Sequence, residues 1–273
     1  MARIFITGSS DRLGLGIRSA RALIKRGHDV YLHARNSQRA QDARTACPGA
    51  KDVFVADLAS VEGTKSLAKQ LNQTGPWDAI AHNAAHPRLA QGVTNPKNKD
   101  GIPVLFVVNT LAPYILTSLV NPPAKRYVFV SSGMHKGGDP SLLNIQQCNY
   151  SDSKLHNVLL SFWFARRLAD RGVLSNAMSP GWVATRMGGS SAPDDIDAAV
   201  DTYVLLAEGS GVAEGETGKY WYQTQARSSS GTGHETSYLK ELDDEDLQDQ
   251  LIETLEKISG VKPPEYFTNW DID

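Results

Sequence analysis

The N-terminal stretch constrains the fold most, because a short apolar run is followed there by a glycine-rich turn and a helix-like segment. Residues 3–7 are apolar and β-rich, residues 8–16 contain Gly8, Gly14 and Gly16, and residues 17–26 are helix-like before Gly27. Strand, glycine turn and helix in this order form the first unit of a dinucleotide-binding fold. The glycines let the backbone approach a pyrophosphate, and the helix N-terminus offers it unpaired N–H groups. A plain strand-to-helix turn is the other interpretation, and Leu15 excludes a Walker A loop.

Strand-like and helix-like segments then alternate along the chain. Further strands are predicted at 30–34, 53–55, 77–81, 127–130, 174–177 and 219–222, and helices at 38–45, 61–71, 104–119, 150–171, 194–207 and 241–259. This alternation predicts an α/β protein with a doubly wound parallel sheet of the Rossmann type, covered by helices on both faces. We expect residues 1–273 to form a single domain, with a substrate loop at about 182–200 and a C-terminal helix at about 241–259. Polar loops are predicted at 86–103 and 225–234.

Composition excludes several classes of protein. The formal net charge is −2 and the basic residues are dispersed, so neither nucleic acid nor an anionic membrane is an expected partner. Cys47 and Cys148 are too few for a disulfide framework and indicate a reducing compartment. No signal peptide or membrane-spanning run is present, so we expect a cytoplasmic protein. No cluster of His, Cys and carboxylate residues has metal-binding spacing.

The end of the second predicted strand indicates which dinucleotide is bound. An acidic residue at this place would accept hydrogen bonds from the ribose hydroxyls of NAD, but here Ala34 is followed by Arg35. A guanidinium forms a bidentate pair with a 2′-phosphate, which a carboxylate would repel. The sequence therefore favours NADP(H), with NAD(H) as the alternative. A solvated loop charge is the other interpretation of Arg35.

A candidate proton-transfer pair begins the predicted helix at 150–171. Tyr150 and Lys154 are four residues apart and so share one helix face. An adjacent ammonium favours the phenolate and is expected to lower the pKa of the tyrosine toward working pH. The spacing also occurs by chance in many helices, so the pair needs support from the rest of the chain.

Two further polar residues stand at informative places. Ser132 follows the end of a predicted strand, where such sheets present reactive groups. A hydrolase built on Ser132 is disfavoured because no Gly-x-Ser-x-Gly elbow surrounds it. Asn109 lies in an apolar helix, where an amide is costly unless it is hydrogen-bonded, so it is either a structural plug or part of a polar site.

Together these motifs resemble the short-chain dehydrogenase/reductase family, in order from Ile4 to about Tyr222. Residues 7–14 resemble its T-G-x-x-x-G-x-G loop, Asp57 and Leu58 its adenine contact, residues 82–85 its N-N-A-G segment, and residues 180–185 its nicotinamide-side loop. Residues 131–135 and 150–155 resemble most the branch that includes retinol dehydrogenases and protochlorophyllide reductases.

The resemblance implies roles for individual residues. The catalytic tetrad would be Asn109, Ser132, Tyr150 and Lys154. The cofactor-binding residues would be Thr7, Gly8, Ser10, Arg12, Leu13, Gly14, Arg35, Asp57, Leu58, Asn83, Ala84, Tyr150, Lys154, Pro180, Gly181, Val183 and Thr185. The chain departs from the family pattern at Arg12, which replaces the middle loop glycine, and at His82 and Ala85 in the N-N-A-G segment. The Arg12 side chain must either point away from the pyrophosphate or contribute a positive charge to it.

The implied reaction is hydride transfer between nicotinamide C4 and a carbonyl carbon. Tyr150 would exchange a proton with the substrate oxygen, helped by Lys154 and Ser132, while Asn109 would order a proton-relaying water. A small hydrophobic carbonyl or alcohol substrate is expected, because several apolar residues could line its pocket, although any of them could instead be core. These residues are Met134, Trp182, Met187, Trp221 and Tyr222.

Two other expectations concern activity and assembly. A non-catalytic nucleotide-sensing regulatory protein with the same fold is the alternative function, which Arg12 would permit. The helix from Tyr150 is apolar on more than one face, which indicates either core or a subunit contact and suggests a homodimer.

Overall fold

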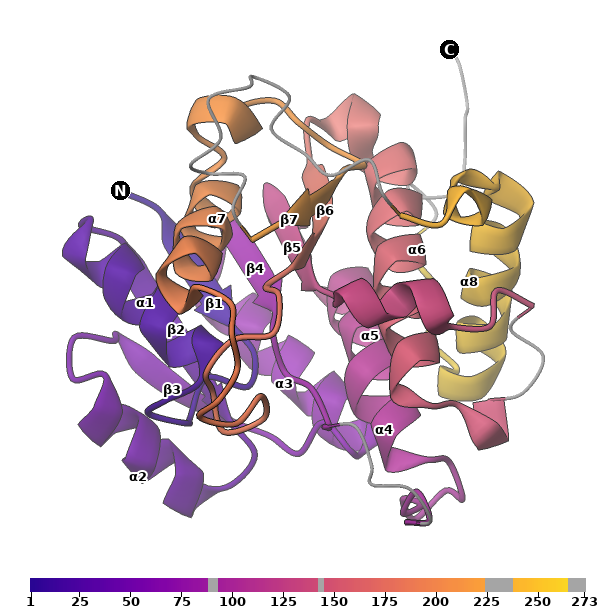
Figure 1. Ribbon diagram of the computed structural model, residues 1–273, viewed down its shortest axis with the longest axis horizontal. Helices are drawn as coiled ribbons and strands as arrows, with labels where there is room; N and C mark the ends of the chain where they lie inside the picture. The colour runs from indigo at the N-terminus through magenta and orange to yellow at the C-terminus, as the bar shows by residue number, and fades with distance from the viewer. Residues whose placement is uncertain (88–92, 142–144, 224–237, 265–273) are drawn as a thin grey trace.

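A seven-stranded parallel sheet forms the centre of the molecule in the computed structural model, which describes residues 1–87, 93–141, 145–223 and 238–264 (Figure 1). Its strands are β1 (Arg3–Ile6), β2 (Asp29–Ala34), β3 (Asp52–Val55), β4 (Ala79–His82), β5 (Arg126–Val130), β6 (Leu174–Ser179) and β7 (Tyr220–Tyr222). The strand order is 3-2-1-4-5-6-7 and each neighbouring pair is parallel. The predicted doubly wound sheet is confirmed.

Helices cover both faces of the sheet. One face packs on α1 (Leu15–Lys25), α2 (Ser37–Ala46) and α7 (Ile196–Glu208), and the other on α3 (Val61–Thr74), α5 (Ala112–Leu119) and α6 (Tyr150–Leu168) (Figure 1). Each face has its own hydrophobic core, with Ile4 and Ile6 in one and Phe5 in the other. Strands buried on both sides read as continuous apolar runs, which is why Ile4, Phe5 and Ile6 are all fully buried.

The strand order indicates which edge of the sheet should bind a ligand, and we call this the functional edge. The chain crosses from the β3 side of β1 to β4 on its other side, so the order reverses between β1 and β4. Ligands of such sheets bind beyond the carboxyl ends of the strands at this reversal. The segments after β1, β4, β5 and β6 therefore border one site.

The helix expected over 104–119 is divided into three parts. A short α4 (Val104–Phe106) leads into a π-helical turn (Val107–Leu111), and α5 follows. Pro113 has no N–H to donate to the carbonyl of Asn109, and the widened turn ends just before this proline. The turn contains Asn109, one of the candidate catalytic residues.

Two other predicted boundaries were wrong by a few residues because capping residues begin the helices later. Asp195 caps α7 at Ile196, which shortens the expected substrate loop. Asp244 caps α8 (Glu245–Ser259), which follows a 3₁₀ turn at Lys240–Asp243. The loop predicted at 225–234 lies outside the described residues.

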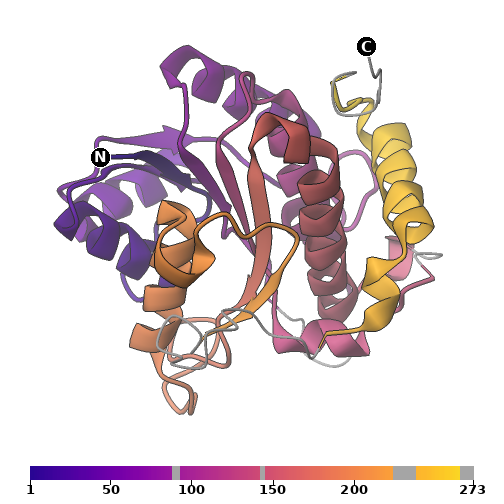
Figure 2. The same ribbon diagram turned by 90° about the horizontal axis from the view of Figure 1, so that it is seen from above.

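The apolar circumference of α6 is explained within one chain. Its inner side packs on β5 and β6, and α8 lies along its outer side (Figure 2). The indole N–H of Trp163 donates to the Asp249 carboxylate at 2.7 Å, and the Tyr114 hydroxyl donates to the Val261 carbonyl at 2.7 Å. Because α8 buries the outer side of α6, the argument that linked this apolar helix to a homodimer no longer holds.

Two further findings concern membranes and disulfides. Within the part of the chain that the structure describes, no helix has both the length and the apolar character that crossing a bilayer requires. Cys47 and Cys148 are free and buried.

Candidate active site

Thr7, directly after β1, joins the glycine loop to the end of β4. Its hydroxyl oxygen accepts hydrogen bonds from the backbone N–H groups of Asn83 and Ala84, each at 2.9 Å. The Asn83 side-chain amide donates in return to the carbonyl oxygens of Thr7 and Gly8, at 2.9 and 3.2 Å. These bonds hold the ends of the two central strands together at the functional edge.

Two glycines allow the close approach that this junction needs. Gly8 has a φ of +61°, and a Cβ there would lie 2.5 Å from the Cα of Ala84. A Cβ on Gly16 would lie 2.6 Å from the side-chain amide nitrogen of Asn83. Gly8 is therefore required for its backbone angle as well as for space, whereas a side chain at position 16 would displace the Asn83 amide from its hydrogen bonds.

The N-terminus of α1 is open to an anion. Gly14 is its N-cap residue, no side chain caps the helix, and the first turn contains no acidic residue. The first N–H groups of a helix have no partner within the helix and lie at its positive end. Together with the close-packed glycine loop, this end fits the pyrophosphate of a nicotinamide dinucleotide.

Several of the predicted cofactor residues lie in the glycine loop and in the segments that follow β2 and β3. Arg12 and Leu13 are exposed in the glycine loop, and Ser10 is half-buried. Among the described residues the Arg12 guanidinium forms no hydrogen bond or ion pair, so it is free of the chain's own polar groups. Arg35 is exposed directly after β2. The Asp57 carboxylate accepts a hydrogen bond from the Ala59 N–H at 3.0 Å, and Leu58 is buried beside it.

His33, which the sequence interpretation missed, connects three segments behind the glycine loop. Its Nδ1 accepts a hydrogen bond from the Gly8 N–H at 3.0 Å, so the proton is on Nε2, which donates to the Ala56 carbonyl at 2.9 Å. Burial lowers the pKa of His33 to about 4, which keeps the ring neutral. The only sequence signal was a polar residue near the end of a strand that is otherwise apolar.

Asn109 is fully buried and its amide is hydrogen-bonded, as an amide in an apolar helix requires. Its oxygen accepts from the His86 N–H at 2.6 Å, and its nitrogen donates to the His86 carbonyl at 3.2 Å. The same nitrogen donates to the Ser153 hydroxyl at 3.0 Å. Asn109 thus fixes the segment after β4 against α6. Ser153 was not singled out from the sequence, because nothing in its spacing marks it.

Tyr150 and Lys154 lie together on the first turns of α6. The Lys154 ammonium nitrogen is 5.5 Å from the centroid of the Tyr150 ring and donates to the Val130 carbonyl at 2.8 Å. Burial raises the pKa of Tyr150 to about 12, opposite to the lowering expected from the sequence. Burial also lowers the pKa of Lys154 to about 7. The expectation was wrong for this structure because desolvation disfavours both charged forms and the ammonium is directed to a backbone carbonyl.

The buried lysine predicts a pH-dependent stability. Between pH 7 and 10, Lys154 is mostly neutral when folded and protonated when unfolded, so the free energy of unfolding should rise with pH, by at most about 1.4 kcal/mol per pH unit. Below pH 7 this contribution is lost and the dependence becomes flat. Urea unfolding of wild type and Lys154→Met across this range should show the rise only in wild type. If the free energy of unfolding changed with pH in the same way in both proteins, the rise could not be assigned to Lys154.

Ser132 and the loop after β6 complete this side of the site. Ser132 is half-buried, and its hydroxyl oxygen accepts a hydrogen bond from the Met134 N–H at 3.2 Å. Gly181 follows Pro180 with a φ of +74°, and the Asp194 carboxylate accepts from the Trp182 N–H at 2.6 Å. This last bond closes the base of the loop.

The tip of the same loop approaches both the glycine loop and Tyr150. Val183 is buried, and the Thr185 hydroxyl accepts from the Gly188 N–H at 3.1 Å. The Arg186 guanidinium lies 3.8 Å from the Asp11 carboxylate in the glycine loop. The Tyr150 hydroxyl lies 3.9 Å from the sulfur of Met187. The loop therefore extends from the glycine loop to the candidate catalytic tyrosine.

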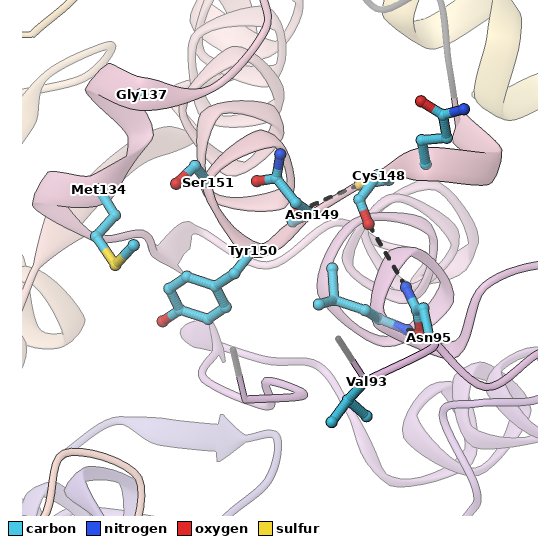
Figure 3. A pocket seen from close by; sticks show the side chains of 10 residues that line it. Val93, Asn95, Met134, Gly137, Cys148, Asn149, Tyr150 and Ser151 are labelled. Carbon is cyan, nitrogen blue, oxygen red and sulfur yellow. Dashed lines mark hydrogen bonds between the residues drawn. The ribbon is translucent and has the colours of Figure 1, made fainter. Parts of the chain in front are cut away.

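A pocket of about 440 Å³ opens beside Tyr150 (Figure 3). Its lining residues are Val93, Asn95, Leu105, Met134, Gly137, Gln147, Cys148, Asn149, Tyr150 and Ser151. They come from the segment after β4, the segment after β5 and the first turn of α6. The pocket is thus bounded by the elements that carry the candidate catalytic residues.

The predicted apolar lining is found only in part. Met134 lines the pocket, and Met187 contacts the Tyr150 hydroxyl from outside the lining set. For Trp221 the structure supports the alternative of a core residue, because it is fully buried between the sheet and α7. Trp182 is exposed and donates to the Gly188 carbonyl at 2.8 Å, and neither it nor Tyr222 is among the lining residues. Four polar side chains line the pocket instead of these aromatic residues.

Histidines near the site serve the fold. His135 is fully buried, its Nδ1 lies 2.8 Å from the Ser132 carbonyl, and its ring packs 4.8 Å from that of Tyr220. His82, which replaces the first Asn of the family segment, is buried and lies 2.8 Å from the Thr117 hydroxyl. Across the described ranges, no group of three or more His, Cys, Asp or Glu side chains has an arrangement suited to a metal ion.

Comparison with known proteins shows matches over most of the chain. A family model described as "short chain dehydrogenase" matches residues 2–196. "Short-chain dehydrogenase chyC" of Penicillium rubens is 40% identical over 275 residues, covering 97% of this chain and 100% of that protein. Mouse "Retinol dehydrogenase 14" is 32% identical over 216 residues, covering 68% of this chain and 62% of that protein.

Solved structures show the same fold at low sequence identity. An uncharacterized protein from Mycobacterium paratuberculosis superposes with a TM-score of 0.74 at 21% identity, covering 97% of this chain and 95% of that one. The structure of BdcA in complex with NADPH gives a TM-score of 0.65 at 20% identity, covering 81% of this chain and 92% of that one. At such identities the likeness establishes the architecture alone.

Proposed function

Since this chain belongs to the short-chain dehydrogenase family of NAD(P)-dependent enzymes, we propose that it interconverts a small, mainly apolar carbonyl compound and its alcohol, with NADP(H) as the preferred cofactor. One observation carries the proposal. The Tyr150 phenol borders a pocket of about 440 Å³, with the Lys154 ammonium nitrogen 5.5 Å from its ring. Val93, Leu105 and Met134 give this pocket apolar surface.

Tyr150 is proposed as the general acid for carbonyl reduction. Its pKa of about 12 keeps the phenol protonated at neutral pH, so the hydroxyl holds the proton that the substrate oxygen needs. In the oxidative direction the phenolate would have to form, which the buried surroundings disfavour. When bound, NADP(H) supplies or accepts the hydride. The half-buried Ser132 hydroxyl, which follows β5, would donate a hydrogen bond to the substrate oxygen.

The other two tetrad residues are proposed to hold this arrangement. Lys154 is anchored to the Val130 carbonyl with its Nζ 5.5 Å from the centroid of the Tyr150 ring, so the lysine is held beside the proposed acid. Asn109 orients Ser153 on α6 and the segment after β4, which places the Tyr150 turn relative to the pocket. The glycine loop and the open N-terminus of α1 would bind the pyrophosphate.

The test is a panel of ketones, aldehydes and alcohols with NADPH or NADP, followed at the nicotinamide absorbance and paired with a nucleotide-binding titration. Nucleotide-dependent turnover of any member supports the proposal. Tight nucleotide binding without turnover across the panel would instead support the non-catalytic nucleotide-sensing alternative, which Arg12 would permit.

Arg35→Asp is expected to shift cofactor preference toward NADH. The guanidinium directly after β2 would pair with a 2′-phosphate, and a carboxylate there would repel it. A charge-assisted hydrogen bond contributes about 1.5–3 kcal/mol, so the ratio of kcat/KM for NADPH to that for NADH should fall by roughly tenfold or more. Lys69→Asp, the same charge change on an exposed residue of α3, should leave the ratio unchanged. An unchanged ratio in Arg35→Asp would count against the NADP assignment.

A further inference from the structure

The pocket beside Tyr150 is polar without being charged. Besides the Tyr150 hydroxyl, four lining residues carry amide or hydroxyl groups, namely Asn95, Gln147, Asn149 and Ser151. None of the ten described lining residues is Asp, Glu, Lys, Arg or His. The chemistry of the wall therefore suits neutral hydrogen bonding.

These polar groups are only partly used by the protein itself. The side-chain oxygen of Asn149 caps α6 by accepting from the Asp152 N–H at 3.2 Å. This bond does not use the side-chain NH₂ group of Asn149, which can donate to a ligand. Gln147 is exposed and, in the described part of the chain, forms no hydrogen bond. Asn95 makes two long contacts, to the Cys148 carbonyl at 3.5 Å and from the Leu105 N–H at 3.4 Å. Donors and acceptors are thus available to a ligand.

Charged groups near the pocket are directed elsewhere. The two carboxylate oxygens of Asp152 accept from the backbone N–H groups of Asp139 and Asn149, at 2.9 and 2.8 Å. The Lys154 ammonium donates to the Val130 carbonyl and is 2% exposed. Among the ten described lining residues, a ligand carboxylate or phosphate would meet no side chain of opposite charge, so the hydration it loses would not be replaced by an ion pair.

We propose that this pocket selects an uncharged carbonyl substrate that carries an amide-like group, which hydrogen-bonds to Gln147 and the Asn149 NH₂ group. The apolar remainder of the substrate packs on Val93, Leu105 and Met134. This inference rests on the proposed function, because it names the substrate class of the same site. The sequence led us to expect an apolar pocket. The proposed pocket is instead apolar with a single polar patch.

Three acetophenones of similar shape separate the effects of an amide, an apolar group and a negative charge. They are 4-acetylbenzamide, 4-isopropylacetophenone and 4-acetylbenzoate. A neutral hydrogen bond contributes about 0.5–1.5 kcal/mol, so kcat/KM and affinity for the benzamide should exceed those for the isopropyl ketone by up to roughly tenfold. The benzoate should be about a hundredfold weaker than the benzamide, since its charge is unpaired. Dissociation constants are measured in the presence of NADP, so the ranking is obtained whether or not turnover occurs.

Gln147→Leu should reduce the ratio of kcat/KM, and of affinity, for the benzamide to that for the isopropyl ketone, because only the Asn149 NH₂ group would then bond to the amide. Gln146→Leu is the matched control, because Gln146 is equally exposed but does not line the pocket. Binding of the benzoate at least as tightly as the benzamide, no binding of any probe, or a ratio that Gln147→Leu does not alter would each overturn the inference. Probe binding with this ranking but no turnover would contradict the proposed function alone.

Discussion

Tyr150→Phe is expected to reduce kcat by at least about a hundredfold, because a positioned general acid contributes about 10²–10⁴ to the rate. The change removes one hydroxyl whose contact in the structure is the Met187 sulfur at 3.9 Å. The fold and the cofactor site should therefore be unaffected, and the dissociation constant for NADPH should stay within a few-fold of wild type. Steady-state kinetics and a fluorescence titration of NADPH measure the two quantities.

A tyrosine outside the pocket provides the control. The Tyr238 hydroxyl donates to the Asp243 carboxylate at 2.8 Å, and Tyr238→Phe removes the same atom without touching the pocket lining. It should retain wild-type turnover. Substantial activity in purified Tyr150→Phe would refute the assignment of the proton donor.

Gly8→Ala is expected to weaken NADPH binding by at least about tenfold. A methyl group at this position would lie 2.5 Å from the Cα of Ala84, and a left-handed φ of +61° costs a non-glycine residue about 1–2 kcal/mol. The glycine loop must then move away from the end of β4, which disturbs the N–H groups at the start of α1. Equilibrium titration of NADPH and urea unfolding report the two consequences.

Gly27→Ala separates backbone strain from the clash. Gly27 has a φ of +88°, but a Cβ there would meet no atom within 4 Å. This variant should lose about 1–2 kcal/mol of stability and bind NADPH normally. Equal NADPH affinities in the two variants would contradict the role assigned to the Gly8 contact.

The sequence predicted the sheet well because its strands are buried on both faces. Runs such as Ile4–Ile6 and the strands after Gly27 and Thr74 are mainly apolar and alternate with helix-like segments, as parallel strands buried on both faces do. The glycines between Thr7 and Ile17 mark the first crossover. The helix ends were less predictable. Asp195 and Asp244 each begin a helix a few residues later than its apolar pattern, since capping depends on local geometry.

The sequence could predict which residues lie at the site, but not how deeply each side chain is buried or which groups it contacts. The spacing of Tyr150 and Lys154 does place them on one helix face, yet the pKa of the phenol depends on burial and on where the ammonium points. The role of His33 depends on contacts to Gly8 and Ala56, which only the folded chain brings together. The two alternatives for Trp221, pocket or core, could not be separated because the sequence does not say which face of the sheet its side chain occupies.

The packing of α8 on α6 has a consequence for how the protein is made. The helix that begins with Tyr150 is covered on its outer side by a helix that ends at Ser259, and the Val261 carbonyl closes the bond to Tyr114. During synthesis about a hundred residues must therefore follow Tyr150 out of the ribosome before this helix has its full set of neighbours. The strands β1, β2 and β3 leave the ribosome long before this point, whereas α6 remains partly uncovered until α8 has been made.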